Sequence, residues 1–527
     1  RSQDELAKTP MALWAELAER LRGFPRHLGI HSGGFILSDQ PLDLLVPQEP
    51  ATMPGRSVVQ WSKEDVEGLG FFKIDMLALG MLTAIRKSFE LIERHEQRTL
   101  TLATVPPDDR PTYAMIQKAD TVGTFQIESR AQMSMLPRLR PAVFYDLVVE
   151  VAIIRPGPIQ GGMIHPYLRR RNGEEKVVYP DPRLKPILER TLGIPIFQEQ
   201  AMRIAMAVGG FTAGEANELR RHMGAWSIKG DIGPWLTRMA DGMRKNGIAE
   251  EFVTSILNQM RGFADYGFPE SHAVSFALLA YASSYLKRHH PAAFFASLLN
   301  SQPMGFYSPH ALLQGAQRDG VEIRPICANR SAMDCTLEET DRSGAGKLAL
   351  RLGLRYVNRL SQKGAELLVR RRDAVGGRFH DLGHFLGNLP LYRSDLTALA
   401  AARALQCFGL ERKAALWLAE AAPLHQTLED VEEAVAWPKE SSLERLQHDF
   451  AATPTSLGPH PTRIIRDEHW CYTVAPAKLA FAKDLAALPA DRFVEVFGMV
   501  LVRQAPPSAN GMVFLDRKST RLNSSHT

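Results

Sequence analysis

Hydrophobic and polar residues alternate clearly in the stretch from Phe71 to Leu77. Phe72 and Ile74 fall on one face of a strand there, while Lys73 and Asp75 fall on the other. Such alternation is typical of a short strand with one apolar and one polar face. The pattern therefore predicts a strand that presents a lysine and a carboxylate side by side, just before a helix.

Glycines and helical periodicity mark the neighbouring segments. The run from Gly29 to Leu37 places glycines beside an apolar strand, which suits close backbone packing. A helix is expected from Gly80 to Arg94, and helical periods dominate from residue 81 to residue 385. Thr212 and Glu215 have the spacing of a capping box that opens one of these helices.

Three further segments complete the predicted helical part. Helices are expected from Gln198 to Val208 and from Ser271 to Leu286, the second of them alanine-rich and buried. Ser308 and Pro309 have the order of an N-cap followed by proline at the first helical position. Residues 386–475 form another helical block, so the fold class is α+β and mostly helical.

The pattern changes to a strand period near the C-terminus. β-branched and aromatic residues favour a strand from Phe493 to Val502, and a second strand begins at Met512 and runs to Leu515. Residues 516–527 are polar and break this pattern. They resemble translated adapter sequence, so we expect a non-native tail there, with a disordered natural tail as the alternative.

The other end of the chain also suggests a fragment. The sequence does not begin with Met, and the residues from Asp4 to Leu21 are typical of an amphipathic helix that is already under way. We therefore expect the chain to be a piece of a longer protein.

Composition and charge restrict the class of protein. Hydrophobic residues make up 45% and charged residues 23% of the 527 residues, which excludes disordered and collagen-like chains. A net charge of +5 permits a nucleic-acid partner without requiring one. The four cysteines form no Cys-x-x-Cys pair, and the longest apolar stretch, from Ala273 to Leu286, is too short to span a bilayer. We expect a soluble, cytoplasmic protein with no membrane partner.

Asp75 is the most informative candidate for chemistry. A carboxylate held on a strand beside Lys73 can bind Mg²⁺ in a phosphoryl-transfer site. Pattern alone favours the simpler interpretation, in which Asp75 caps the following helix. Sites with two metal ions also need a second carboxylate, and the chain contains no Asp-x-Asp.

Several arginines are candidates for phosphate contacts. Arg220 and Arg221 lie near the end of the capped helix, where adjacent guanidinium groups suit a triphosphate. Arg155 precedes a stiff Pro-Gly-Pro turn, and residues 169–171 form an arginine run that we place in a loop. A solvated surface is the alternative in each case. A zinc site at His31 and its neighbour four residues upstream is not favoured, because glycines surround both.

Taken together, seven motifs are specific in their order along the chain. They are His27-Leu28-Gly29-Ile30-His31-Ser32-Gly33-Gly34, Lys73-Ile74-Asp75-Met76-Leu77-Ala78-Leu79-Gly80, Thr124-Phe125-Gln126-Ile127-Glu128-Ser129-Arg130, Arg155-Pro156-Gly157-Pro158, Phe197-Gln198-Glu199-Gln200, Leu219-Arg220-Arg221 and Tyr266-Gly267-Phe268-Pro269-Glu270-Ser271-His272. Over residues 20–515 the chain resembles the bacterial C-family DNA polymerases, the family of the polymerase III alpha subunit. The segments 129–138 and 301–308 are most similar to the error-prone branch of that family.

The resemblance implies an arrangement of domains. Residues 1–80 would be the C-terminal part of the polymerase palm and residues 81–385 the fingers. Residues 386–475 would form the helix-hairpin-helix and clamp-binding region, and residues 476–515 the start of an OB-type β-barrel. The family's paired aspartates, its N-terminal PHP domain and its thumb would lie upstream of this chain.

The resemblance also implies roles for individual residues. Asp75 corresponds to a catalytic aspartate that binds Mg²⁺, and Arg220, Arg221 and Arg155 would contact the incoming nucleotide. Further active-site support is expected from Lys73, His31, Gln126, Arg130, Gln198 and His272.

The implied partners are primer-template DNA, deoxynucleoside triphosphates, the sliding clamp and accessory proteins of damage tolerance. The expected activity is error-prone, DNA-directed DNA synthesis. Two alternatives stay open: a replicative alpha subunit, and a non-catalytic piece that binds DNA and the clamp.

Overall fold

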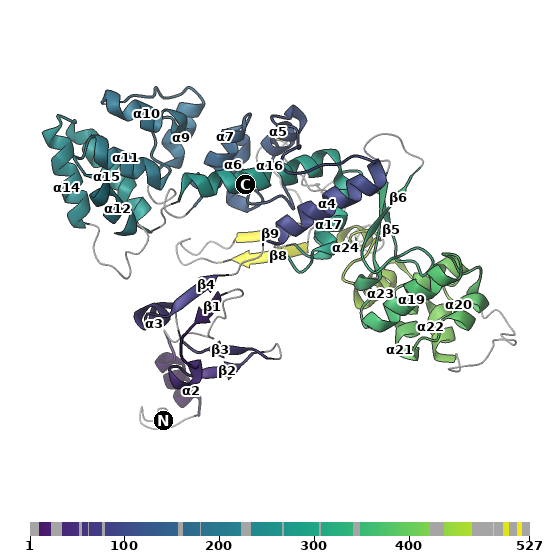
Figure 1. Cartoon of the computed structure of the whole chain (residues 1–527). Coiled ribbons are helices and arrows are strands. Elements are labelled where there is room, and N and C mark those ends of the chain that lie inside the picture. The colour runs from purple at the N-terminus through teal and green to yellow at the C-terminus, as the bar shows by residue number, and fades with distance from the viewer. Residues whose placement is uncertain are drawn as a thin grey trace. The chain divides into compact units, whose positions relative to one another are not determined.

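The computed structural model divides the chain into two units, which are described separately (Figure 1). The first comprises the described residues up to 79, and the second comprises those from 80 onward. The structure describes residues 10–22, 34–51, 55–61, 63–75, 79–155, 162–179, 181–222, 233–265, 268–304, 307–340, 348–421, 437–465, 489, 499–504 and 514–518.

The first unit contains two small antiparallel sheets. β4 (Phe72–Asp75) pairs with β1 (Gly34–Leu37), and β2 (Gln48–Pro50) pairs with β3 (Ser57–Val59). Two α-helices accompany them, α2 (Pro10–Arg20) and α3 (Lys63–Gly68), with the short 3-10 helix η1 (Leu42–Leu44). The predicted strand around residue 74 and the predicted N-terminal helix are therefore confirmed.

The apolar face of β4 is exposed within this unit. The side chains of Phe72 and Ile74 are 67% and 36% exposed, and their cross-strand partners Leu37 and Phe35 are also exposed. The predicted separation of an apolar and a polar face is confirmed, because Lys73, which lies between Phe72 and Ile74, is less exposed than either.

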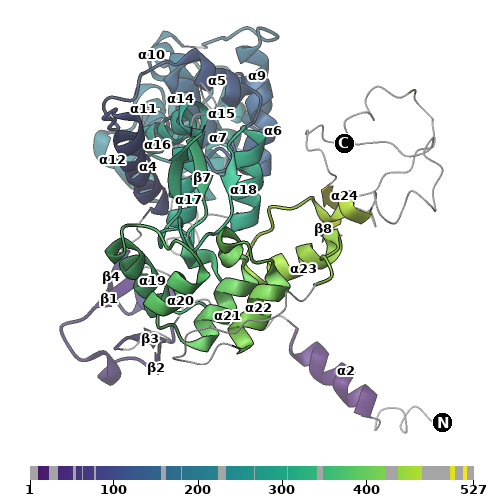
Figure 2. The ribbon, with the colours of Figure 1, turned by 90° about the vertical axis from the view of Figure 1, so that its right-hand side faces the viewer.

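The second unit is organised around one buried helix, α16 (Glu270–His289). Alanine and serine dominate its buried positions, so neighbouring helices can approach it closely. It packs against α4 (Gly80–Glu96), α5 (Arg110–Gln117), α7 (Phe144–Ile153) and α17 (Pro291–Asn300), as Figure 2 shows. The predicted alanine-rich helix is confirmed and begins one residue earlier than expected.

The remaining helices of this region follow the predicted pattern closely. The capping box at Thr212 is present, since the Glu215 N–H donates to Thr212 Oγ1 (3.3 Å) and the Thr212 N–H donates to Glu215 Oε2 (2.8 Å). Ser308 caps its helix as expected. The helices are α6 (Arg130–Leu139), α9 (Ile164–Arg171), α10 (Lys185–Leu188), α11 (Gln198–Ala207), α12 (Ala213–His222), α14 (Gly233–Lys245), α15 (Glu250–Asp265) and α18 (Pro309–Arg318), with the 3-10 turns η2 (Pro182–Leu184) and η3 (Glu189–Thr191).

The arginine run at residues 169–171 was wrongly placed in a loop. The three arginines form the last turn of α9, where cations are favourable next to the negative end of the helix dipole. The chain leaves the helix only at Asn172 and Gly173, and Gly173 has a positive φ of 76°. The glycine that suggested a loop therefore marks the end of the helix.

A three-stranded sheet lies in the segment that was expected to be mostly helical. β7 (Leu348–Arg351) is central, with β5 (Ile323–Arg324) parallel to it and β6 (Thr336–Glu339) antiparallel. All four β7 residues are buried. Such short strands produce no clear periodicity, which explains why the sequence pattern did not predict them.

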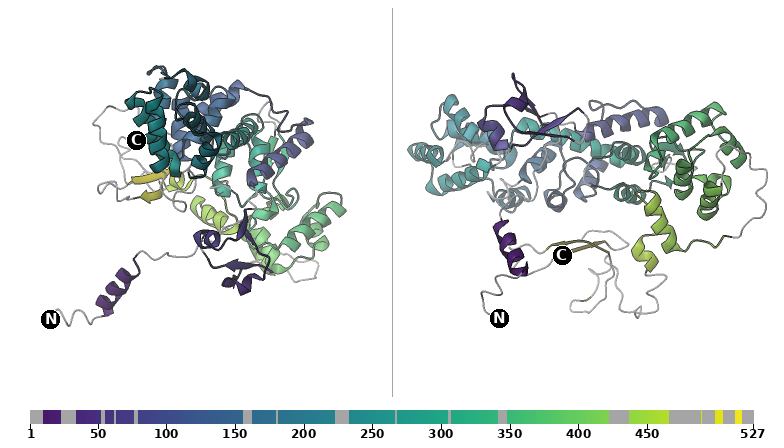
Figure 3. Two further views of the ribbon diagram at one scale, coloured as in Figure 1. Left: turned by 60° about the vertical axis from the view of Figure 1, so that its left-hand side comes forward. Right: turned by 90° about the horizontal axis from the view of Figure 1, so that it is seen from below.

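A helical cluster follows this sheet and contains the helices drawn in green in Figure 3. Its helix α21 packs closely on α22, and Gly409 adopts the left-handed conformation (φ 80°) in the turn that joins η6 to α22. The predicted helical block is confirmed over its described residues. The elements are η5 (Leu354–Tyr356), α19 (Gln362–Ala374), α20 (Leu382–Asn388), α21 (Arg393–Ala401), η6 (Ala404–Phe408), α22 (Arg412–Ala421), α23 (Ser442–Ala452) and α24 (Pro461–Ile465).

The last described element is the antiparallel hairpin of β8 (Met499–Gln504) and β9 (Phe514–Lys518). The predicted hairpin is confirmed, but the expected break at residue 516 is wrong, because β9 continues to Lys518 through ladder pairing with β8. The beginning of the first predicted strand, at residues 493–498, lies outside the described residues. Within the described ranges the hairpin joins no other strand, so no barrel is formed by them.

Among the residues that the structure describes, no helix combines the length and the apolar character that crossing a bilayer requires.

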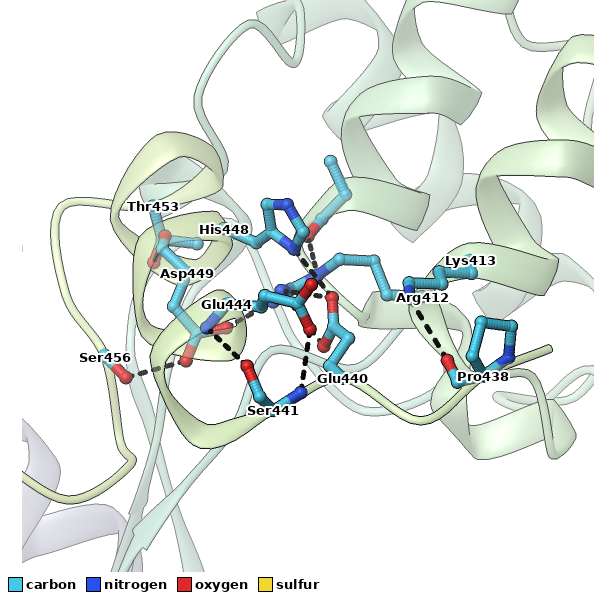
Figure 4. A network of polar contacts seen from close by, with 11 residues as sticks. Arg412, Lys413, Pro438, Glu440, Ser441, Glu444, His448, Asp449, Thr453 and Ser456 are labelled. Carbon is cyan, nitrogen blue, oxygen red and sulfur yellow. Dashed lines mark hydrogen bonds and ion pairs between the residues drawn. The ribbon is translucent and has the colours of Figure 1, made fainter. Parts of the chain in front are cut away.

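A buried ion-pair network joins α22 to α23 (Figure 4). The Arg412 side chain is 3% exposed, and its guanidinium binds Glu440 (Nη1 to Oε1, 3.1 Å), Asp449, and the Ala401 carbonyl (2.9 Å). Burial alone would raise the pKa of Glu440, but His448 and Arg412 together hold it below its usual value. One arginine therefore connects three segments of the helical cluster.

Removal of this arginine should destabilise the cluster. Arg412→Ala would leave two buried carboxylates without their cation, so we expect the free energy of unfolding to fall by about 3–5 kcal/mol. Urea titration, with hydrogen exchange of α22 and α23, measures the loss.

A matched control lies on the neighbouring helix. Arg393 pairs with Glu420 at the surface, where the two side chains are 52% and 62% exposed. Arg393→Ala should therefore cost less than about 1 kcal/mol. Equal losses in the two variants would contradict the importance assigned to the buried network.

Candidate functional site

The strand β4 carries the predicted metal ligand in the first unit. Asp75 is the last residue of β4 and lies opposite Gly34 in the ladder, while Lys73 is half-buried. The structure does not describe the side chain of Asp75, and His31 lies outside the described residues. Across the described parts of the chain, no three His, Cys, Asp or Glu side chains gather as metal ligands would. Asp75 has the chemistry of one ligand for a divalent cation.

In the second unit, an arginine and several rings gather around Phe268. The Arg155 guanidinium carbon lies 3.6 Å from the centroid of the Phe268 ring. His272 contacts Phe268 and Phe276, with ring centroids 4.9 Å and 4.0 Å apart, and Phe276 contacts Phe125 at 5.0 Å. We call Phe125, Arg155, Phe268, His272 and Phe276 the Phe268 cluster. It joins three of the predicted motifs, which are far apart in sequence.

The electrostatics of the Phe268 cluster follow from its packing. Burial lowers the pKa of Arg155. Burial, with a smaller contribution from the Arg155 charge, also lowers the pKa of His272. The Arg155 Nε donates to the Val151 carbonyl (3.2 Å), and its terminal nitrogens form no hydrogen bond with any residue that the structure describes. The cluster thus combines a positioned guanidinium with a histidine that favours its neutral form.

Two further predicted residues adjoin this cluster through the backbone. The Gln198 N–H donates to the Phe268 carbonyl (3.1 Å), at the start of α11. Gln126 follows Phe125 and adopts a positive φ of 61°, an uncommon conformation for a residue other than glycine. The predicted nucleotide contact Arg155 and three predicted support residues, His272, Gln126 and Gln198, therefore belong to or adjoin one cluster.

Glu128 is a candidate that the sequence argument quoted but did not select. Burial, opposed by a hydrogen bond from the Gly123 N–H (3.1 Å), raises the pKa of Glu128 to about 7. Tyr307 donates to the backbone carbonyl of Glu128 (3.5 Å), and the Lys287 charge favours the ionised form. A carboxylate that titrates near neutral pH is typical of functional sites. In the sequence, Glu128 is a single acidic residue after the turn at Gly123, and this pattern does not show how far the fold buries its side chain.

The remaining predicted arginines lie at helix ends. Arg130 is exposed at the first position of α6, next to the cap formed by Ser129. Arg220 and Arg221 are exposed in the last turn of α12, where Arg220 Nε binds Asn217 (3.3 Å) and Arg221 Nη1 binds Glu218 (2.9 Å). Within the described structure, the hydrogen bonds and ion pairs of Arg220 and Arg221 stay inside α12 and do not reach the Phe268 cluster.

Comparison with protein families assigns the chain to a class of polymerase. Residues 81–247 match the finger domain of the bacterial DNA polymerase III alpha subunit, and residues 2–78 match its NTPase domain. Residues 320–415 match a helix-hairpin-helix motif. The chain belongs to the C-family of bacterial DNA polymerases, the family of the polymerase III alpha subunit.

Curated relatives narrow this assignment to one branch. The chain is 48% identical over 507 residues to the error-prone DNA polymerase of Pseudomonas fluorescens (strain Pf0-1), covering 95% of this chain and 48% of the relative. Identity to the error-prone DNA polymerase of Alkalilimnicola ehrlichii is 49%, covering 96% of this chain and 49% of the relative. Identity to error-prone DNA polymerase 2 of Rhizobium meliloti is 47%, covering 96% of this chain and 47% of the relative. The chain falls in the error-prone branch and spans about half the length of these relatives.

The matched ranges overlap the predicted domains without testing their limits. The finger match begins at residue 81, where we expected the fingers to begin, and it ends at residue 247. The helix-hairpin-helix match begins at residue 320, earlier than the predicted region 386–475. The domain limits stay predictions.

Substitution of Glu128 should change how stability depends on pH. The folded carboxyl, with a pKa of about 7 against 4.5 for the free group, holds its proton more tightly than the unfolded one does. Its contribution to stability is therefore greatest below pH 4.5 and is lost as the pH rises to 7. Glu128→Gln keeps an acceptor for the Gly123 N–H and removes the titration.

Urea titrations of the full chain at several pH values measure this effect. The free energy of unfolding of Glu128→Gln, relative to the parent, should rise by up to about 3 kcal/mol between pH 4.5 and pH 7.5. A difference that stays constant over this range would contradict the raised pKa of Glu128.

Proposed function

We propose that the chain is part of a DNA-directed DNA polymerase that works in error-prone, damage-tolerant synthesis. The observation that carries the proposal is the 47–49% identity over at least 95% of the chain to proteins named error-prone DNA polymerases. In the proposed reaction, the primer 3′-hydroxyl attacks the α-phosphorus of a deoxynucleoside triphosphate, and pyrophosphate leaves. Base pairing with the template selects the nucleotide, while the protein grips backbone phosphates.

Asp75 is proposed as a ligand for Mg²⁺ in the complete polymerase. Its position at the end of a paired strand supports the proposal, because strand ends hold ligands more precisely than loops do. A bound Mg²⁺ lowers the pKa of a coordinated hydroxyl and stabilises a leaving oxygen. Lys73 and His31 are proposed to support this ligand, and the rest of the coordination shell has to come from other groups.

The arginines are proposed to contact the triphosphate. Arg220 and Arg221 are exposed at the end of α12, and among the described residues Arg220 binds Asn217 alone and Arg221 binds Glu218 alone, which leaves further N–H donors for a triphosphate. Arg155 would present its terminal nitrogens from the Phe268 cluster. Gln126, Arg130, Gln198 and His272 would orient the groups around it.

The larger regions are proposed to have the roles that the resemblance implies. Residues 1–80 would complete a palm and residues 81–385 would form the fingers. Residues 386–475 would contact DNA and a sliding clamp through helix-hairpin-helix elements, and residues 476–515 would begin an OB domain. The helix-hairpin-helix match and the β8–β9 hairpin support the last two assignments in part.

Replacement of Asp75 tests the proposed chemistry. In the full-length protein, Asp75→Asn should lower primer extension by at least about a thousandfold, because an amide is a poor substitute for a charged ligand. Primer-template binding should stay within about twofold. Gel-based extension and a binding titration measure the two properties.

An exposed aspartate in the same unit provides the control. Asp43 lies in η1, and Asp43→Asn should extend primers at the parent rate. Near-normal extension by Asp75→Asn would reject the assignment of Asp75 as a metal ligand.

Replacement of Arg220 tests nucleotide binding. Loss of one charged donor to a triphosphate should raise the apparent KM for nucleotide about tenfold or more. Steady-state extension kinetics of Arg220→Ala measure this change, with Arg203→Ala, an exposed arginine on α11, as control. An unchanged apparent KM and kcat for Arg220→Ala would refute the role.

A further inference from the structure

A positively charged cleft lies between the end of α6 and α9, apart from the residues proposed for catalysis. Its volume is about 790 Å³. The two helices are in contact, and the buried side chains of Leu139 and Leu168 contribute to its lining. The polar residues around it are Arg138, Arg140, His165, Arg169, Arg171, Asn172 and Glu174.

Two of the arginines in this cleft are free to bind a ligand. Arg171 is committed to the buried carboxylate of Asp146 (2.6 Å), and Arg169 shares Glu175 (2.9 Å) with its neighbour. Arg138 and Arg140 are exposed, and no described residue forms an ion pair with either. The lining and its ion-pair partners together contain five arginines, which are the four lining ones and the adjacent Arg170. They contain three carboxylates, those of Asp146, Glu174 and Glu175. The cleft is therefore positive.

The backbone at Arg140 supports a functional interpretation. Arg140 ends α6 in the left-handed conformation (φ 49°), and its N–H donates to the Leu136 carbonyl (2.9 Å). Glycine is the usual residue at this position of a helix end, because it avoids the strain of a positive φ. Arg140 keeps a charged side chain at this position, and both Arg140 and Arg138 line the cleft. Strained residues often mark ligand sites.

The cleft has the chemistry and the size for one phosphodiester strand. Guanidinium groups bind phosphate oxygens through two parallel hydrogen bonds. Its volume is that of a small-ligand pocket, so it can take a few nucleotides of one strand but not a duplex. No Phe, Tyr or Trp lines it, so bases would find no ring to stack on.

We propose that this cleft binds the sugar-phosphate backbone of a single nucleic-acid strand, independently of its sequence. The proposal rests on the polymerase function proposed above, for which a single template strand is part of the substrate. It adds a second anchoring site for that strand, formed by Arg138 and Arg140.

Fluorescence polarisation of labelled oligothymidylate with the full chain tests the proposal. Arg138→Gln combined with Arg140→Gln should weaken binding roughly tenfold at moderate salt. The slope of log K against log salt concentration should fall by about 1.4, or about 0.7 for each lost phosphate contact on a single strand. Arg94→Gln removes an exposed arginine of α4 that forms no ion pair with any described residue, and it should leave affinity and slope unchanged.

A glycine substitution separates binding from folding. Arg140→Gly removes the charge and relieves the positive φ, so we expect weaker binding together with an unchanged or higher Tm. Unchanged affinity and slope in the double variant would overturn the proposal. The proposal would also fail if only those variants whose Tm falls lost affinity for the oligothymidylate. It would fail as well if the variants bound a labelled duplex more weakly than the unmutated chain does but bound the single strand equally well.

The outcome is independent of the catalytic test. Binding is measured without nucleotide or divalent metal, so a failure of primer extension leaves this readout intact. If the unmutated full-length protein extends primers normally and the cleft variants bind the single strand unchanged, the proposed role of the cleft is rejected. The proposed polymerase function is then unaffected.

Discussion

The buried ammonium group of Lys287 fixes the part of the second unit on which the Phe268 cluster depends. Its side chain is 2% exposed and donates to the carbonyl (2.9 Å) and to Oδ1 (2.7 Å) of Asp120. A buried cation is costly unless it is paired, so the loop around Asp120 has to stay against α16. Ser283 accepts the Phe125 N–H (3.0 Å), and Tyr281 accepts the Asp109 N–H (2.9 Å) and donates to the Pro106 carbonyl (2.6 Å). Polar groups on one apolar helix therefore hold the segment from residue 106 to residue 125.

The shape of this segment determines where Gln126 and Glu128 lie. Gly123 has a φ of 83°, and a Cβ atom there would come within 2.9 Å of Leu298 Cδ1 on α17. The positive φ favours glycine in this turn, and the Gly123 N–H donates to the Glu128 carboxylate (3.1 Å). Gly123 and Phe125 are thus held against α17 and α16, next to Gln126 with its positive φ and close to Glu128, whose side chain is half-buried.

This dependence explains which features could be predicted from the sequence. The capping box at Thr212, the N-cap at Ser308 and the strand that ends at Asp75 depend on neighbours within a few residues, and all three are present. The raised pKa of Glu128 depends on its burial in the folded chain, where it contacts Tyr307, 179 positions away, and no local pattern contains that information. The arginine run at residues 169–171 was misplaced because a following glycine can mark either a loop or a helix end. Arg155, Gln198 and His272 come from three separate motifs and meet around Phe268, a proximity that depends on the fold and that no local periodicity contains.

The distribution of arginines shows why net charge alone says little about nucleic-acid binding. The excess of +5 comes from 63 basic and 58 acidic residues, so most charges have a possible partner. Arg351 and Arg412 are buried against carboxylates, and Arg372 is buried against the Ala328 and Ser331 carbonyls, so these cations serve the fold. Arg138 and Arg140 have the same side chain but lie exposed beside a cleft, one of them on a strained backbone. Whether an arginine stabilises the protein or binds a phosphate is therefore decided by the groups that surround it, and the exposed arginines without partners are the ones that a nucleic acid can use.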